Sequence, residues 1–458
     1  MSDPTIDAAA APHPTASGPA ASGPNIFRRV YKSISGSNLL SRALLLGLLT
    51  LALKIPLGLV GGVIDDRQTH ESEATRKVTD SWGSAQIFTG PMMVLPFKRF
   101  SDGKDDRTLT LLPEKLSIDG EVKPEQRQRG LFAVTVYTAT LDVVAEFQLK
   151  AVRDLLVEDR KIDWTAARLS VGLTDLKAIS VATLEIDGQP VEWNSGLGAS
   201  QSTLPASLGA LDLAKSETVS VRFRIIFGGS GCLLLAPLGR RTDATLSSSW
   251  PSPSFIGRYL PVSQSIDKDG FQAKWSTSNL GRRYGQLWDS GNGTQPESGV
   301  VADSAFGFAL YNPIDAYRQT ERAIKYAVLF IGLTFAACLV FEMATGTRPH
   351  LAQYGLIGLS LCVFYLLLLS ASEQIGFAPA YLASAAAVVL QATVYNWALY
   401  RRRGAALAFG AILSGLYAGL YGLLRLEDVA LLAGSLLLFA VLSLAMWLTR
   451  NLHRVKPA

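Results

Sequence analysis

The chain has 458 residues, of which 48% are hydrophobic and 18% are charged, and its formal net charge is +5. Soluble domains carry more charge than this, and the apolar residues are concentrated near residue 50 and after residue 323. The basic residues lie beside these apolar segments and form no stripe on a soluble fold, which argues against nucleic-acid binding and predicts a membrane protein.

The N-terminal region predicts a tail followed by a membrane anchor. Residues 1–24 are mostly Ala, Pro, Ser, Thr and Gly, a composition that cannot bury enough apolar surface to become ordered. The apolar run from Ala43 to Ile64 is long enough to cross about 30 Å of hydrocarbon. Because no A-x-A cleavage site precedes Asp65, an uncleaved anchor is favoured over a cleaved signal peptide.

The middle of the chain predicts a β-rich domain. A polar, helix-forming segment from Asp65 to Ala85 first continues the anchor helix. Runs rich in β-branched and aromatic residues then predict strands at Ile87–Phe97, Leu131–Leu149, Leu169–Ile186, Thr218–Phe227, Ala244–Trp250, Phe255–Val262 and Phe271–Ser276. Turns are predicted at Ser117–Pro124, Asp187–Pro190 and Asp267–Gly270. Many short strands with few helices between them favour an antiparallel sandwich.

The C-terminal region predicts five further spans. They are placed at Ile324–Met343, Leu351–Ala371, Gly376–Ala398, Gly404–Leu424 and Asp428–Leu448. The expected fold class is therefore a membrane protein with six transmembrane helices, one plus five, and a large antiparallel β-sandwich-like domain. The expected parts are a tail at 1–38, a transmembrane helix at 39–64, the β-rich domain at 65–322, a five-helix bundle at 323–449 and a tail at 450–458.

The distribution of Lys and Arg predicts the orientation of these spans. The short loops on one side include Arg28, Arg29, Arg42, Arg401, Arg402 and Arg403, whereas the opposite short loops hold only Arg425. By the positive-inside rule both termini are cytoplasmic and the β-rich domain is translocated. The basic residues next to that domain oppose this assignment, but the rule is weak beside long domains.

Several segments are similar to a known family, the bacterial inner-membrane protein CreD, also called cell envelope integrity protein. They are WGSAQIFTGPMMVLPF from Trp82, LLPEKLSIDGEVKPEQRQRGLFAVTVY from Leu111, SSSWPSPSFIGRYLP from Ser247, GFQAKW from Gly270, YNPIDAYRQTERAIKYAVLFIGLTFAACLVFE ending at Glu342 and LAQYGLIGLSLCVFYLLLLSASEQIGF ending at Phe377. The long tail before Ile26 and a Gly/Ser-rich patch at 195–209 depart from the family pattern.

The resemblance implies a bacterial inner-membrane protein with a periplasmic domain. It further implies production under a two-component system and an effect on envelope integrity and on sensitivity to β-lactams or colicins. It carries no catalytic residues over to this chain.

Three ionisable residues within or beside the predicted spans are candidate functional groups. Lys54 falls near the middle of the first span, two residues before Pro56, which predicts a kink there. A charge at this depth costs roughly 2.5 to 3.5 kcal/mol on insertion scales, so the hypothesis is that Lys54 faces the later helices; the alternative is snorkelling on a tilted helix. Glu342 and Glu373 are expected near the two interfaces, where solvation or helix capping is the ordinary role.

No other pattern predicts chemistry. The arginines at 401–403 could bind anionic lipid head groups, although their ordinary role is to set orientation. No metal ligands, cofactor site or catalytic residues are predicted, because the cysteines and histidines lack ligand spacing and Ser247–Ser249 has no nearby histidine.

Three classes of function are compatible with this pattern. The leading hypothesis is a non-enzymatic envelope protein, whose partners are the lipid bilayer and an unknown envelope component or membrane protein. A transporter or lipid flippase is the alternative, and an enzyme acting on lipid or peptidoglycan precursors comes third. A cavity at Lys54 would favour transport, whereas a filled bundle would favour anchoring; convergent ionisable groups in a cleft would favour an enzyme.

Overall fold

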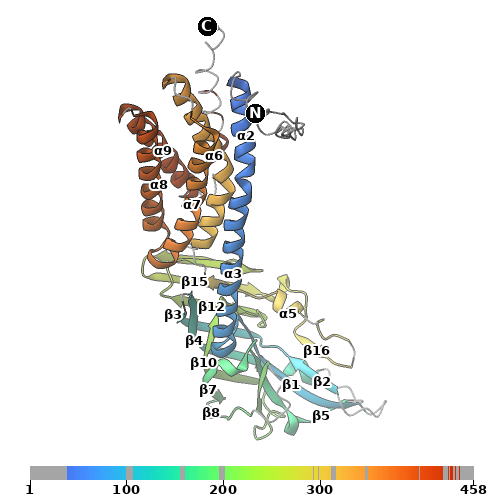
Figure 1. Ribbon diagram of the computed structural model, residues 1–458. Helices are drawn as coiled ribbons and strands as arrows, with labels where there is room; N and C mark the ends of the chain where they lie inside the picture. Colours follow the sequence, from blue (N-terminus) through green and yellow to red (C-terminus); the bar gives the residue numbers. More distant parts are fainter. Residues whose placement is uncertain are drawn as a thin grey trace, which may run out of the picture. The chain divides into compact units, whose positions relative to one another are not determined.

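The computed structural model describes residues 39–99, 107–130, 132–154, 160–194, 202–291, 293–297, 299–310, 316–345, 349–401 and 403–425, with scattered positions between 432 and 443 (Figure 1). The chain divides into two compact units. One contains residues up to Gly62 together with those from Arg318 onward, and the other is Val63–Tyr317.

The helical unit consists of long apolar helices. They are α2 (Leu39–Ala52), the start of α3 (Lys54–Trp82), α6 (Ala316–Thr345), α7 (Leu351–Ile375), α8 (Phe377–Tyr400) and α9 (Arg403–Arg425). Counting α2 and α3 as one, five of the described helices are long and apolar enough to cross a membrane. The first five predicted spans are thus confirmed as helices, and the sixth, Asp428–Leu448, lies largely outside the described residues.

The first helix is interrupted near its predicted kink. Leu53 separates α2 from α3 and lies three residues before Pro56, whose nitrogen carries no hydrogen for the preceding turn. The Leu53 amide donates to the Leu49 carbonyl at 2.9 Å, and the Leu57 amide donates to Leu53 at 3.2 Å, so helical bonding continues on both sides. The interruption lies next to the position where Pro56 predicts a kink.

The helix around Leu53 approaches α7 closely at a glycine. A Cβ added at Gly358 would lie 2.3 Å from Leu53 Cδ1 and 2.8 Å from Phe335 Cζ. Real Cβ atoms do not approach other atoms so closely, so the absence of a side chain at Gly358 allows this packing.

We expect Gly358→Leu to lower the unfolding free energy by about 1 to 3 kcal/mol, because the added atoms must displace Leu53 and Phe335. The measurement is thermal unfolding of the purified full-length protein in detergent. Gly355→Leu is the matched control on the same helix, because nothing lies within 4 Å of a Cβ at Gly355. Equal shifts for the two variants would contradict the packing argument.

The second unit is built from two β-sheets that continue from the C-terminal part of α3. The nine-stranded sheet has the order β13 (Pro253–Gly257), β17 (Phe306–Leu310), β11 (Cys232–Leu235), β1 (Gln86–Arg99), β2 (Arg107–Leu111) and β16 (Leu287–Asp289), with β5 (Arg160–Ile162), β6 (Arg168–Gly172) and β9 (Thr203–Ser207) joined to it through β1 and β6. The eight-stranded sheet has the order β14 (Ser263–Asp267), β15 (Gly270–Ser278), β12 (Arg241–Ser248), β3 (Lys115–Arg129), β4 (Phe132–Gln148), β10 (Thr218–Ser230), β7 (Ile179–Ile186) and β8 (Gln189–Pro190).

The two sheets face each other across one hydrophobic core. Aromatic rings from opposite sheets meet there: the centroids of Phe271 and Phe308 are 4.7 Å apart, and those of Trp275 and Phe306 are 5.5 Å apart. At another place in the core Phe88 packs against Phe223 with centroids 6.2 Å apart. The sandwich-like architecture predicted from the strand pattern is confirmed.

The prediction of a purely antiparallel domain is wrong in one respect. β1 pairs with β11, and β3 pairs with β12, in parallel register, whereas the other named pairs are antiparallel. Parallel neighbours need a long crossover, and the chain between β3 and β12 supplies one that includes β4, β7 and β10. The domain is therefore a mixed-sheet sandwich.

The predicted turn at Ser117–Pro124 is also wrong, because these residues lie inside the long strand β3. Buried and exposed positions alternate there, with Leu116, Ile118, Gly120 and Val122 facing the core. Gly120 is a packing residue and not a turn residue, since a Cβ there would lie 2.5 Å from Leu246 Cδ2.

The other two predicted turns are confirmed. Asp187 and Gly188 have φ of 51° and 80° and join β7 to β8. Positive φ at both positions is the conformation that an Asp-Gly pair adopts in tight hairpins. Asp267 pairs with Gly270 where β14 turns into β15.

Candidate functional site

A buried ion pair connects three helices of the helical unit. Arg42 on α2 contacts the carboxylate of Glu342 on α6 through Nη1 and Oε1. The hydroxyl of Tyr354, in the first turn of α7, donates a hydrogen bond of 2.8 Å to the other carboxylate oxygen, Oε2. Glu342 is only 8% exposed, so the carboxylate is held by these two partners and not by bulk water.

Local structure places the Tyr354 ring. His350 caps the N-terminus of α7: its Nδ1 accepts from the Ala352 amide at 3.3 Å, and its own amide donates to Gln353 Oε1 at 2.7 Å. The Tyr354 ring packs edge-on against Phe335 of α6, with centroids 6.2 Å apart. The hydroxyl is thereby held at the carboxylate.

The electrostatics of this cluster indicate a structural contact between helices rather than a reactive centre. An unpaired charge in an apolar bundle is costly, and the arginine neutralises the carboxylate. A carboxylate that is neutralised and accepts a hydrogen bond is a poor general base. The cluster therefore fastens the N-terminal helix to α6 and α7.

The structure corrects the expected environment of Glu342. Sequence reasoning placed it near an interface with solvation or capping as its ordinary role, but it is buried and paired. Its partner Arg42 was counted only among the orienting charges. The two residues are too far apart in the chain for helical spacing to connect them.

Lys54 does not face the later helices. Its side chain is exposed, whereas the neighbouring Leu53 and Leu57 are buried. The hypothesis that Lys54 points into the bundle is wrong for the described residues, because apolar side chains occupy that face of the helix. The exposed position is the one that snorkelling requires.

The remaining predicted residues lie at helix ends. Glu373 is partly buried in the last turn of α7. Arg401 ends α8 with φ of 51°, and its amide donates to the Trp397 carbonyl at 2.9 Å. Arg403 begins α9. Arg28, Arg29 and Arg402 lie outside the described residues.

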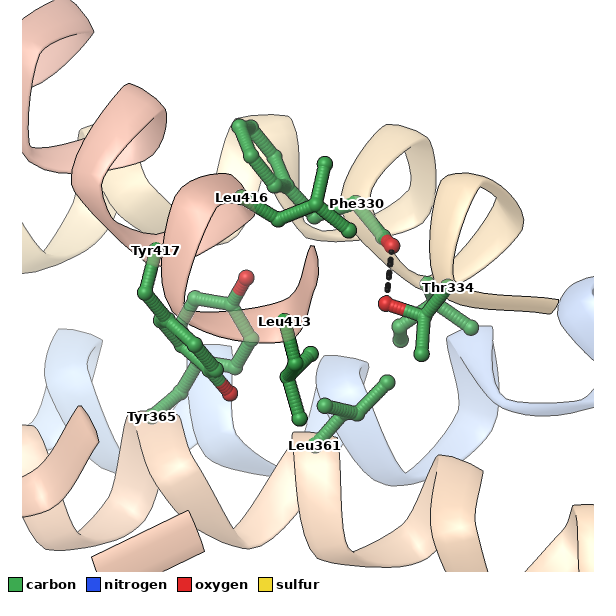
Figure 2. A pocket seen from close by; sticks show the side chains of 8 residues that line it. Phe330, Thr334, Leu361, Tyr365, Leu413, Leu416 and Tyr417 are labelled. Carbon is green, nitrogen blue, oxygen red and sulfur yellow. Dashed lines mark hydrogen bonds between the residues drawn. The ribbon is translucent and has the colours of Figure 1, made fainter. Parts of the chain in front are cut away.

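The interior of the helical unit contains a small cavity. Figure 2 shows the side chains that line this cavity, between α6, α7 and α9. The cavity has a volume of about 10 Å³, which is room for about one water molecule. Mostly apolar side chains line the cavity. The Thr334 hydroxyl, which also lines it, donates a hydrogen bond of 2.8 Å to the Phe330 carbonyl. Lys54 is not among the lining residues, so this cavity does not supply the transport path that the alternative function requires.

The β-rich domain carries a much larger surface groove of about 670 Å³. It crosses β3, β12, β14 and β15, and it is lined by Glu121, Val122, Lys123, Ser247, Ser248, Ser249, Ser265, Asp267, Asp269, Gly270, Phe271 and Gln272. Sequence reasoning had noted the three serines, but it could not place them beside the turn that follows β14.

Two serines of this groove are already hydrogen-bonded to the backbone. The Ser247 hydroxyl donates to the Gly120 carbonyl at 3.2 Å, and the Ser248 hydroxyl accepts from the Trp250 amide at 3.2 Å. No histidine lines the groove to activate a serine. Among the described residues no group of three His, Cys, Asp or Glu side chains could hold a metal ion.

Two of the acidic groups in the groove are also engaged locally. The ammonium group of Lys123 lies 3.2 Å from Glu121, and Asp267 Oδ1 accepts from the Asp269 amide at 2.9 Å. The groove thus presents hydroxyl, amide and carboxylate groups around the edge of Phe271. Such a surface suits a polar ligand.

The helices and the sandwich together define a class: a multi-pass membrane protein that carries a large mixed-sheet domain between its first and later spans. Comparison with known proteins gives the family. The profile of the family described as "Inner membrane protein CreD" matches residues 38–454. The chain is also 32% identical over 416 residues to the Escherichia coli (strain K12) protein "Inner membrane protein CreD", which covers 88% of this chain and 90% of that protein. The chain belongs to the CreD family of inner-membrane proteins.

Proposed function

We propose that the chain is a non-enzymatic inner-membrane protein that supports envelope integrity and the response to envelope or β-lactam stress. In this proposal the helices anchor the protein, and the β-rich domain binds or senses an envelope component. The observation that carries it is the groove of about 670 Å³, which is lined by serines and acidic residues and by no histidine.

The proposed orientation places both termini in the cytoplasm and the domain in the periplasm. The positive-inside rule supports it, because Arg401, Arg402 and Arg403 lie between α8 and α9. Arg425, at the other end of α9, is a single charge. The domain would then meet the partners that the proposal requires.

The groove is tested by a matched pair of variants on the edge strand β14. Ser263 and Ser265 are both exposed and point to the same side of the strand, but only Ser265 lines the groove. In a strain lacking this gene we expect wild type and Ser263→Trp to restore resistance to β-lactam or detergent stress. Ser265→Trp should fail because the indole fills the groove.

Membrane abundance of each variant is the control. Equal complementation by both variants at equal abundance would contradict a role for the groove. A transport function has weaker support, because the cavity of Figure 2 has room for only about one water.

A further inference from the structure

An apolar groove lies between the ends of α8 and α9 nearest the arginines, on the surface of the helical unit. Its volume is about 410 Å³, and it is lined by Thr393, Val394, Trp397, Arg403, Ala406 and Leu407. The lining covers about one helical turn on each helix, or about 6 Å along the axis.

Thr393 lies where α8 and α9 are close together. A Cβ added at Gly410 would lie 2.4 Å from Thr393 Oγ1, so the two helices touch at this point. The groove is therefore bounded toward the middle of the helices and extends from there to the arginines.

The walls of the groove are exposed apolar side chains. Val394 is 52% exposed, Trp397 is 47% exposed and Leu407 is 68% exposed. These residues lie in helices that are long and apolar enough to span a membrane. Lipid is the solvent for such a surface, and tryptophan is favoured at the level of the head groups.

The arginine end of the groove carries positive charge without an acidic counterpart on either helix. α8 and α9 contain no Asp or Glu, and the exposed Arg401 and Arg403 lie in and beside the turn between them. The Arg403 guanidinium carbon is 5.5 Å from the Trp397 ring centroid, which holds the cation at the mouth of the groove.

We propose that this groove binds an anionic phospholipid. The phosphodiester would pair with Arg403 and Arg401, and the glycerol backbone and first methylenes would lie against Trp397, Val394 and Leu407. Charge complementarity favours this occupant over a second copy of the chain, because the same helix faces would bring like charges together.

The role of the arginine charge in lipid binding is tested by native mass spectrometry of the full-length protein in detergent. Phosphatidylglycerol and phosphatidylcholine with identical acyl chains are compared as ligands. We expect selective retention of phosphatidylglycerol by wild type. Arg403→Gln should weaken it about fivefold, since one charge contributes on the order of a fivefold change in affinity. Arg425→Gln is the matched control, because Arg425 also stacks on an aromatic ring, Tyr421, at the other end of α9.

The groove itself is tested by a bulky substitution that keeps every charge. Leu407→Trp should also weaken phosphatidylglycerol retention, whereas Ile412→Trp should leave it unchanged, because Ile412 is exposed on the same helix outside the groove. Equal retention of the two lipids by wild type would overturn the proposal, as would equal effects of the two glutamine variants or the two tryptophan variants. A lipid-free dimer that is lost in Leu407→Trp but kept in Ile412→Trp would overturn it as well, since a second copy would then cover the groove.

Discussion

Glu342→Leu is expected to lower the unfolding free energy by about 3 to 5 kcal/mol, because it leaves the Arg42 guanidinium without its carboxylate in an apolar bundle. Arg42 is 20% exposed, which favours the lower end of that range. Tyr354→Phe removes only one hydrogen bond to the carboxylate, so about 1.5 to 3 kcal/mol is expected.

The measurement is a double-mutant cycle on the full-length protein, with unfolding in detergent followed by circular dichroism. Arg42→Leu combined with Glu342→Leu removes both charges and should recover most of the stability lost by Glu342→Leu alone. Additive losses for the two single variants would show that the residues are not coupled. The cycle separates the ion pair from general damage to the helices.

Arg282→Met is expected to destabilise the β-rich domain by about 3 kcal/mol or more. The Arg282 side chain is buried, and its Nη1 donates to the carbonyls of Pro237, Leu238 and Gly239 at 2.9, 2.6 and 3.2 Å. A buried carbonyl that loses its donor costs about 1 to 3 kcal/mol. Leu238 and Gly239 lose the Arg282 donor, whereas Pro237 keeps the Tyr284 hydroxyl at 3.2 Å. Burial, which disfavours the charged form, lowers the pKa of Arg282.

Arg283→Met is the matched control for Arg282→Met, because the adjacent Arg283 is exposed and should change stability by about 0.5 kcal/mol or less. Limited proteolysis of the full-length protein reports opening of the domain directly. We expect faster cleavage within residues 237–286 for Arg282→Met alone. The same cleavage rate in both variants would contradict the role given to the buried guanidinium.

Membrane helices and about half of the described strands could be predicted from the sequence because their signals are local. Apolar runs of about 20 residues predicted α6 to α9, and period-two runs predicted β1, β4 and β10. Several strands were not predicted, among them β2, β11 and β17, and part of β3 was predicted as a turn. The segment Ser117–Pro124 of β3, which contains Gly120 and Pro124 among polar residues, has the composition of a turn, and only the neighbouring strands show that its alternate residues are buried.

The candidate sites could be predicted less well, because they depend on contacts between distant segments. Arg42 and Glu342 lie in different helices, and neither position is unusual on its own. Lys54 was predicted to face inward because the sequence gives only its depth in the span. The direction of its side chain depends on the rotation of the helix, which is set by the packing of Leu53 and Leu57 against the rest of the unit. The groove beside Ser265 likewise requires the pairing of β12 with β15.

The central claim is that the membrane separates the β-rich domain from the arginines between α8 and α9. Single cysteines at Ser265 and Arg401, in a chain with Cys232, Cys338 and Cys362 replaced, can be treated in intact spheroplasts with a membrane-impermeant maleimide. The account predicts labelling of Ser265→Cys without lysis and of Arg401→Cys only after lysis. Labelling of Arg401→Cys in intact spheroplasts, with Ser265→Cys protected until lysis, would contradict it.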